Sequence, residues 1–285
     1  MNIETVGVVG SGTMGSGIAQ VLIQEGYKTV LYDITEEIVS RARKTIFARI
    51  DRLVEKGKLT NENGEQVKNS LVCTANLSEM KDCQVVIEAA PEKIEIKKEI
   101  FEKLENYCSS ETLLATNTSS FSVTEIASQI GSPARVAGMH FFNPAPLMPL
   151  VEVIKGIQTS QETIDALYKL AKELNKTPVI CEDTPGFIVN RVARPFYNEA
   201  IRIMKDQIAS PEQIDRILKK AGQFKMGPFE LQDLIGIDIN FATTASVYKG
   251  SFGESRFRPH FYQERMVQSG RLGRKAGGGY FEYEK

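Results

Sequence analysis

The chain has 285 residues, 42% hydrophobic and 25% charged, a composition typical of a globular protein of about two domains. Its 35 basic and 36 acidic side chains give a formal net charge of −1, which favours neither a nucleic acid nor an anionic membrane as partner. The four cysteines form no CxxC pair, which gives no support for a metal site. With no secretory signal pattern at the start, we expect a cytoplasmic protein with reduced cysteines.

The first half of the chain alternates apolar, β-branched runs with helical patterns, an order typical of a parallel sheet with crossover helices. Long apolar runs also predict strands that are buried on both faces. The strand-like runs are residues 5–10, 28–33, 71–75, 84–89, 112–116, 135–142, 149–154 and 177–182, with helical patterns at 13–26 and about 36–56.

The pattern changes after Glu182, where a Pro-Gly break leads into successive helical segments. These segments are residues 186–206, 211–221, 228–235, 238–248 and a stretch from about 259. We therefore predict an α/β fold, with a Rossmann-type doubly wound, mainly parallel sheet in residues 1–184. A smaller all-helical domain is expected in residues 185–285.

A glycine-rich loop follows the first predicted strand. Gly10, Gly12 and Gly15 have GxGxxG spacing between a strand and a helix, a context that predicts dinucleotide binding. Asp33 ends the second strand, at the place where a carboxylate binds the ribose hydroxyls of a dinucleotide. No arginine directly follows Asp33 to bind a 2′-phosphate, so NAD is favoured over NADP. The loop residues expected at the cofactor are Gly10, Ser11, Gly12, Thr13, Met14 and Gly15.

Only two histidines are present, His140 and His260. His140 ends an apolar strand, and a strand–loop–strand connection can return Glu152, twelve residues later, to its ring. A carboxylate on one ring nitrogen fixes the tautomer and prepares the other nitrogen to take a hydroxyl proton. A core histidine satisfied by the backbone is the alternative, but the nearby dinucleotide fingerprint favours catalysis. His260 has no carboxylate partner in its pattern, and we expect it to be structural or at the surface.

Two further residues are candidates because of their positions. Ser119 follows a predicted strand, at the carboxyl edge of the sheet where ligands of open α/β folds bind, although a helix cap would explain it equally. Asn190 lies on the first turns of the helix that begins the second domain, where a solvent-facing residue is the ordinary alternative.

A basic helix is predicted near residues 41–58, which carry seven basic and two acidic side chains. Arg49, Arg52 and Lys56 are spaced three and four apart and therefore share one helix face. Such a face suits a phosphorylated ligand, and a solvated helix surface is the alternative.

Taken together, the motifs resemble those of the 3-hydroxyacyl-CoA dehydrogenases, in particular the short bacterial 3-hydroxybutyryl-CoA dehydrogenases. The resemblance covers nearly the whole chain through VGSGTMGSGIAQ, VIEAAPE, ATNTSS, GMHFFNPAP with LVEVI, DTPGFIVNR, MGPFEL and LGRKAGGGY. It implies catalytic roles for His140 and Glu152 and substrate contacts for Ser119 and Asn190. It also implies NAD contacts at the glycine loop, Asp33, Glu92, Lys97, Ser119, Asn143 and Lys275, and CoA contacts at Arg52 and Lys56.

The resemblance implies NAD-dependent oxidation of (S)-3-hydroxyacyl-CoA, and the reverse reduction, by a homodimer in fatty acid or butanoate metabolism. The 3-hydroxybutyryl substrate is favoured, and a 3-hydroxyadipyl-CoA dehydrogenase of aromatic-acid breakdown is the alternative. A sugar-acid type dehydrogenase has a similar glycine loop but uses a helical lysine for proton transfer. A non-catalytic NAD-binding relative is a further alternative.

Overall fold

The computed structural model describes residues 2–284, which divide into two compact units, residues 2–184 and 185–284. We describe each unit by itself.

An eight-stranded sheet is the centre of the first unit within the described residues, with strand order β3-β2-β1-β4-β5-β6-β7-β8. All neighbouring strands are parallel except β6 and β7, which are antiparallel. This confirms the predicted mainly parallel sheet. The strands are β1 (Thr5–Val9), β2 (Lys28–Tyr32), β3 (Leu71–Thr74), β4 (Val85–Glu88), β5 (Leu113–Thr116), β6 (Val136–Phe141), β7 (Leu150–Lys155) and β8 (Thr177–Glu182).

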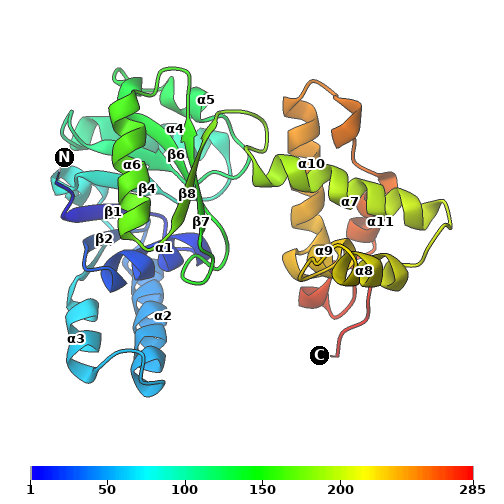
Figure 1. Ribbon diagram of the computed structural model, residues 1–285. Coiled ribbons are helices and arrows are strands. Elements are labelled where there is room, and N and C mark those ends of the chain that lie inside the picture. The colour runs from blue at the N-terminus through cyan, green and yellow to red at the C-terminus, as the bar shows by residue number, and fades with distance from the viewer. Residues whose placement is uncertain (1, 285) are drawn as a thin grey trace. The chain divides into compact units, whose positions relative to one another are not determined.

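Helices join the strands and cover the sheet (Figure 1). They are α1 (Thr13–Gln24), α2 (Glu36–Glu55), α3 (Asn61–Asn69), α4 (Ile94–Tyr107), α5 (Val123–Ala127) and α6 (Gln161–Glu173). Side chains of α1, α2 and α6 share one apolar cluster with the strands. Helix α5 lies on the opposite face of the sheet. Gly138 of β6 faces away from this cluster, because its neighbours Ala137 and Met139 belong to it, and a Cβ at Gly138 would lie 3.0 Å from Val123 of α5.

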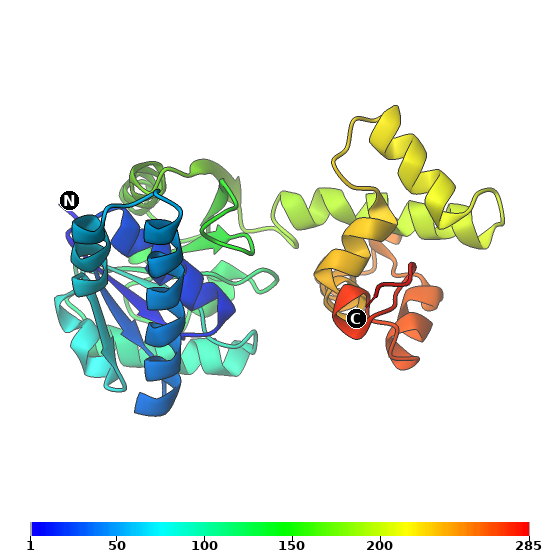
Figure 2. The same cartoon turned by 90° about the horizontal axis from the view of Figure 1, so that it is seen from below.

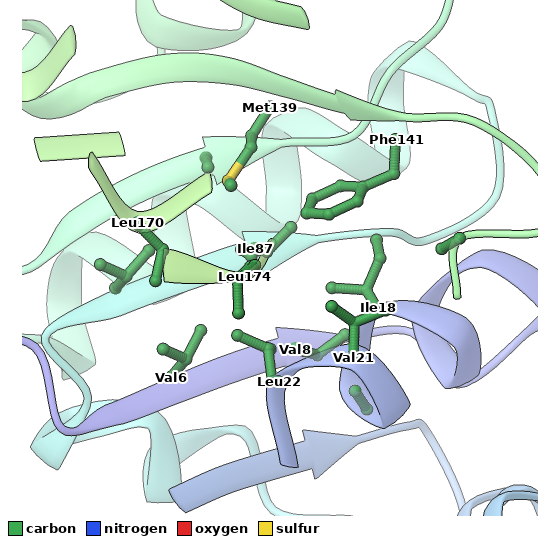
Figure 3. Close-up of a cluster of buried hydrophobic side chains, with 14 of the residues drawn as sticks. Val6, Val8, Ile18, Val21, Leu22, Ile87, Met139, Phe141, Leu170 and Leu174 are labelled. Carbon is green, nitrogen blue, oxygen red and sulfur yellow. The ribbon is translucent and has the colours of Figure 1, made fainter. Parts of the chain in front are cut away.

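The main core lies between the sheet and α1 and α6. Because side chains alternate across a strand, every second residue of each central strand enters this core, and the residues between them face the opposite side. Burial of apolar side chains contributes about 25 cal/mol per Å². Figure 3 labels Val6, Val8, Ile87, Met139 and Phe141 of the strands against Ile18, Val21, Leu22, Leu170 and Leu174.

The prediction that the apolar strands are buried on both faces is correct for the centre of the sheet and wrong for its edges. In β8, Val179 and Ile180 are exposed, and so is Val72 of β3. These strands end the sheet on either side, and an edge strand has a neighbour on one side only.

The sequence does not predict helix α3, because its segment NENGEQVKN has no apolar residues that recur at helical spacing. Thr60 caps it, accepting a hydrogen bond from the N–H of Asn63 at 3.1 Å. A Cβ at Gly64 would lie 2.7 Å from the side chain of Val54, so the absence of a side chain lets α3 pack closely on α2. Capping and close approach therefore replace an apolar stripe in this helix.

The second unit consists of helices within the described residues (Figures 1 and 2), as predicted. Ser210 and Gln213 form a capping box at the start of α8, and Pro211 and Pro228 lie in first turns, where a missing N–H costs nothing. The first helix begins at Val189, later than the predicted 186, because Gly186 and Phe187 adopt positive φ angles of +77° and +49°. The helices are α7 (Val189–Lys205), α8 (Pro211–Lys220), α9 (Pro228–Ile235), α10 (Ile237–Gly250) and α11 (Phe261–Gln268).

The motif LGRKAGGGY folds back onto α9 at Asp233. This fully buried carboxylate accepts hydrogen bonds from the backbone N–H groups of Tyr280 and Phe281, both at 2.9 Å, and from the Tyr283 hydroxyl at 3.0 Å. A Cβ at Gly279 would lie 2.1 Å from the Asp233 Oδ1. The glycine-rich motif is therefore explained by packing around a buried acceptor.

None of the helices formed by residues 2–284 has the length and apolar character that a membrane span requires.

Asp233→Ala removes the acceptor of these three hydrogen bonds and leaves two part-buried backbone N–H groups without their acceptor. We expect the free energy of unfolding to fall by about 1.5–3 kcal/mol or more, as is typical for hydrogen bonds to a charged group. Tyr283→Phe removes one donor only and should cost about 1 kcal/mol. Urea unfolding of the whole chain measures both, and an unchanged midpoint for Asp233→Ala would contradict this role.

Candidate active site

The glycine loop joins β1 to α1, and its three glycines meet different constraints. Gly10 has φ +96°, a conformation that L side chains rarely adopt. A Cβ at Gly15 would lie 1.7 Å from the carbonyl oxygen of Gly10, so the fold itself excludes a side chain there. A Cβ at Gly12 would meet nothing within 4 Å. The fold therefore requires Gly10 and Gly15, and the flank of Gly12 is open for a ligand to approach the backbone.

The start of α1 provides an anion site beside this loop. Within the described residues, no side chain caps this helix end and no acid lies in its first turn, which begins with Thr13 and Met14. Its N–H groups and the positive end of the helix dipole suit a diphosphate. The Asp33 carboxylate accepts hydrogen bonds from the Ser11 N–H and hydroxyl, both at 2.7 Å. The arrangement fits a dinucleotide, with phosphates at the helix and a ribose at Asp33.

A cluster of charged and hydroxyl groups joins the ends of β4 and β5. The Lys97 ammonium, on α4, is buried and lies 3.2 Å from Glu92. Glu92 accepts hydrogen bonds from the Thr118 hydroxyl at 2.7 Å and from the Ser119 N–H at 2.9 Å. Burial raises the pKa of Glu92, but Lys97 and these hydrogen bonds outweigh it and hold the pKa below its usual value. Glu92, Lys97 and Ser119, three of the implied NAD contacts, thus lie together, and their contact with the cofactor stays a prediction.

His140 and Glu152 lie directly opposite each other on the antiparallel strands β6 and β7. The Nδ1 of His140 is 2.7 Å from Glu152 Oε2, and both side chains are buried. When Glu152 is ionised it can only accept a hydrogen bond, and the tautomer that matches this contact has the proton on Nδ1 and the lone pair on Nε2. The sequence predicted this pairing from the spacing of the two residues.

Two neighbours hold the end of β6 in place. The side-chain oxygen of Asn117, after β5, accepts a hydrogen bond from the Phe141 N–H at 2.8 Å. The ring of Phe142 lies 4.5 Å, centroid to centroid, from the His140 ring. The imidazole therefore contacts a carboxylate through Nδ1 and lies close to an aromatic ring.

A basic cavity of about 270 Å³ lies between α1, α2 and the loop after β6. Arg49 and Arg52 line it from α2, and Asn143 lines it from the loop. Lys56, predicted on the same helix face, follows the last helical residue of α2 and is not part of the lining. Two of the three basic residues predicted on this helix face, Arg49 and Arg52, therefore line the cavity.

The remaining predicted residues belong to the second unit. Lys275 is paired with Asp238, with 2.6 Å between Nζ and Oδ1. Asn190 lies in the first turn of α7, and its carbonyl oxygen accepts a hydrogen bond from the Arg194 guanidinium at 3.0 Å. The roles of Lys275 and Asn190 toward cofactor and substrate stay predictions.

His260 caps α11, as its Nδ1 accepts a hydrogen bond from the Tyr262 N–H at 3.1 Å. Burial, together with Arg202 and Lys205, lowers the pKa of this histidine. Its contacts are thus those of a structural residue.

Sequence reasoning missed Glu88 as part of the charged cluster. Glu88 Oε1 is 2.8 Å from the Lys97 ammonium, and the carboxylate is fully buried. The available signal was a glutamate inside the apolar run of residues 84–89. Across residues 2–284, no group of three or more histidine, cysteine or acidic side chains is arranged to hold a metal ion.

The comparisons with known proteins cover both units. The sequence model of the 3-hydroxyacyl-CoA dehydrogenase NAD binding domain matches residues 5–184. That of the 3-hydroxyacyl-CoA dehydrogenase C-terminal domain matches residues 186–283.

Similar proteins carry related names. A 3-hydroxyadipyl-CoA dehydrogenase of Escherichia coli (strain K12) is 48% identical over 99% of this chain, which spans 60% of that relative's length. A 3-hydroxybutyryl-CoA dehydrogenase of Clostridioides difficile is 41% identical, over 98% of this chain and 99% of the relative.

Solved structures agree with these relatives. A 3-hydroxybutyryl-CoA dehydrogenase from Escherichia coli K12 superposes with a TM-score of 0.98 at 48% identity, covering 100% of this chain and 61% of that one. An (S)-3-hydroxybutyryl-CoA dehydrogenase from Ralstonia eutropha gives a TM-score of 0.96 at 38% identity, with both chains covered completely. The family and cofactor expected from the sequence are thereby confirmed. The chain belongs to the 3-hydroxyacyl-CoA dehydrogenase family of NAD-dependent enzymes, with the NAD-binding domain first and the family's C-terminal domain after it.

Proposed function

We propose that the chain catalyses the NAD-dependent oxidation of (S)-3-hydroxyacyl-CoA to 3-oxoacyl-CoA, and the reverse reduction. The observation that carries this proposal is the buried pair of His140 and Glu152, with 2.7 Å between Nδ1 and Oε2. The pair belongs to the same unit as the glycine loop and Asp33. A general base and a dinucleotide site in one domain are what an alcohol dehydrogenation needs.

In the proposed mechanism, Nε2 of His140 takes the proton of the substrate 3-hydroxyl. Glu152 accepts the hydrogen bond from Nδ1–H and stabilises the imidazolium that results. The chemistry that NAD⁺ supplies when bound is acceptance of the hydride that leaves C3. Phe142, beside the ring, limits the orientations of the imidazole. In the reverse direction, the Nε2–H of the imidazolium protonates the oxygen of the 3-oxo group as C3 is reduced.

Ser119 and Asn190 are proposed to orient the substrate oxygen for this proton transfer. Ser119 follows β5 and is held by Glu92. The Glu92 carboxylate accepts hydrogen bonds from the Ser119 N–H at 2.9 Å and from its hydroxyl at 3.3 Å. Asn190 brings an amide group at the start of α7. Holding reacting groups in one geometry is a major source of catalytic rate.

The CoA moiety is proposed to bind along α2. Arg49 and Arg52 line the cavity beside Asn143, and guanidinium groups pair well with phosphates. Lys56, exposed just beyond the helix, is proposed to add to the attraction for the CoA phosphates without lining the cavity.

For the acyl group, the proposed substrates are 3-hydroxybutyryl-CoA in fatty acid or butanoate metabolism and, as second candidate, 3-hydroxyadipyl-CoA in aromatic-acid breakdown. The second candidate is favoured by the name of the 48% identical Escherichia coli relative, and the first by the Clostridioides difficile relative that this chain matches almost end to end.

We also propose a homodimer in the cytoplasm. Four free cysteines suit a reducing compartment. The dimer is what the resemblance implies, and exposed apolar side chains of the second unit, Val192, Ile217 and Phe252, are available for such an interface. A mass measurement in solution that gives a monomer would contradict the dimer.

A substrate panel tests the activity. With NADH and acetoacetyl-CoA, longer 3-oxoacyl-CoAs or 3-oxoadipyl-CoA, we expect oxidation of NADH, followed at its absorbance, with acetoacetyl-CoA among the good substrates. A higher kcat/KM for 3-oxoadipyl-CoA would favour the second candidate. Absence of turnover with every thioester, by a protein that binds NADH, would exclude the proposed activity.

His140→Gln removes the base and keeps a side chain of similar size. Because general acid–base catalysis contributes about 10²–10⁴-fold, kcat should fall by at least that factor while the Kd of NADH is unchanged. His260→Asn, the matched control, keeps a good helix cap and should retain wild-type turnover. Wild-type turnover by His140→Gln would contradict the catalytic assignment.

Arg52→Glu reverses one charge that lines the basic cavity. We expect the KM for acetoacetyl-CoA to rise about tenfold, equivalent to about 1.4 kcal/mol, with the KM for NADH unchanged. Lys44→Glu is the matched control, since Lys44 is exposed on the same helix and does not line the cavity. Equal effects of the two substitutions would mean that only the overall charge of α2 matters.

A further inference from the structure

Glu88 is a fully buried carboxylate at the carboxyl end of β4. It alternates with Ile87, which is part of the core against α1 and α6, and therefore faces the opposite side of the sheet. Burial of a carboxylate is costly unless it is paired and hydrogen-bonded. A glutamate at this position is therefore expected to make interactions that an apolar residue could not make.

The partners of Glu88 come from three elements. The Lys97 ammonium on α4 donates to both carboxylate oxygens, at 2.8 and 3.0 Å. The hydroxyl of Thr116, at the end of β5, donates to Oε2 at 2.7 Å, and the Ala90 N–H donates to Oε1 at 2.7 Å. Glu88 therefore connects the carboxyl ends of β4 and β5 with helix α4. The glycine loop lies at the same ends of the strands.

Lys97 carries this arrangement on to Glu92. An ammonium group has three hydrogens, and the two contacts to Glu88 fix its orientation. The third direction is available for Glu92, whose Oε2 is 3.2 Å away. Glu92 in turn accepts hydrogen bonds from Ser119 and from the Ser120 hydroxyl, at 2.9 and 3.1 Å. A continuous series of short contacts thus leads from a buried carboxylate to the loop after β5.

We propose that Glu88 is a positioning residue of the cofactor site: it fixes the Lys97 ammonium, and Lys97 fixes the Glu92 carboxylate beside Ser119. This inference rests on the proposed function and on the NAD contacts that the resemblance implies for Glu92, Lys97 and Ser119. Glu88 does not touch the cofactor and acts through Lys97. The Lys97 ammonium is shared by two carboxylates. Glu88 holds it through two hydrogen bonds, so that Glu92 pairs with a cation whose position is fixed.

The experiment measures the Kd of NADH for the intact protein in the absence of any thioester. Glu88→Gln keeps the size of the side chain but offers one acceptor oxygen to Lys97 in place of two. We expect the Kd to rise about tenfold, as for the loss of a hydrogen bond to a charged group. Glu105→Gln is the matched control, because Glu105 is also on α4 but accepts the N–H groups of Gly131 and Ser132. It should leave the Kd unchanged even where it lowers the thermal midpoint.

A double-mutant cycle separates positioning from general stability. If Glu88 acts through Lys97, the double variant Glu88→Gln/Lys97→Met binds NADH no more weakly than Lys97→Met alone. Additive effects on the Kd, or an unchanged Kd in a folded Glu88→Gln protein, overturn the proposal.

Thr116→Val keeps the inference testable if Glu88→Gln does not fold. It removes only the hydroxyl that donates to Glu88 and should raise the Kd of NADH by about threefold, which is less than the loss of one charged hydrogen bond. In that case an unchanged Kd overturns the proposal. Wild-type protein that binds NADH but reduces no 3-oxoacyl-CoA would instead contradict the proposed function, since NADH binding is measured without the thioester.

Discussion

The sheet of the first unit is covered on both faces, and this constraint governs where polar chemistry can occur. A polar side chain on a central strand has little access to water and must find its partners among its neighbours. Glu152 finds His140 across a strand pair, and Glu88 finds Lys97 and Thr116. All of these strand residues lie on the face opposite the main core, at positions that alternate with core residues. The face opposite the main core thus combines apolar packing, as at Val86 and Leu114, with these ionisable groups.

The sequence predicted the parts of the site that depend on local spacing. The glycine loop and Asp33 have a fixed order along strand, turn and helix, and the spacing of His140 and Glu152 matches two strands joined by a loop. The structure brings Asp33 to Ser11 and His140 to Glu152 by hydrogen bonds of 2.7 Å. Short-range geometry of this kind is determined by the repeat of a strand and by sterics, which sequence patterns express directly.

Other parts depend on tertiary contacts and have weak sequence signals. Helix α3 lacks an apolar stripe and forms by capping at Thr60 and close packing at Gly64. Glu88 stood in an apolar run, and its pairing with Lys97 requires knowing which face of β4 meets α4. The exposure of Val179 follows from the edge position of β8, which strand order alone decides. In each case the deciding neighbour comes from another element of the chain.

The antiparallel pairing of β6 with β7 also makes the contact between His140 and Glu152 depend on the correct strand register. His140 is opposite Glu152, and Met139 is opposite Val153, in one register. A slip of one residue would turn one strand's side chains to the other face and would put the imidazole or the carboxylate alone into the apolar core. The misaligned hairpin would then bury an unpaired ionisable group, which is strongly unfavourable. The pair that we propose for proton transfer therefore also acts as a register mark, so that the sheet is at its most stable only when the site is correctly assembled.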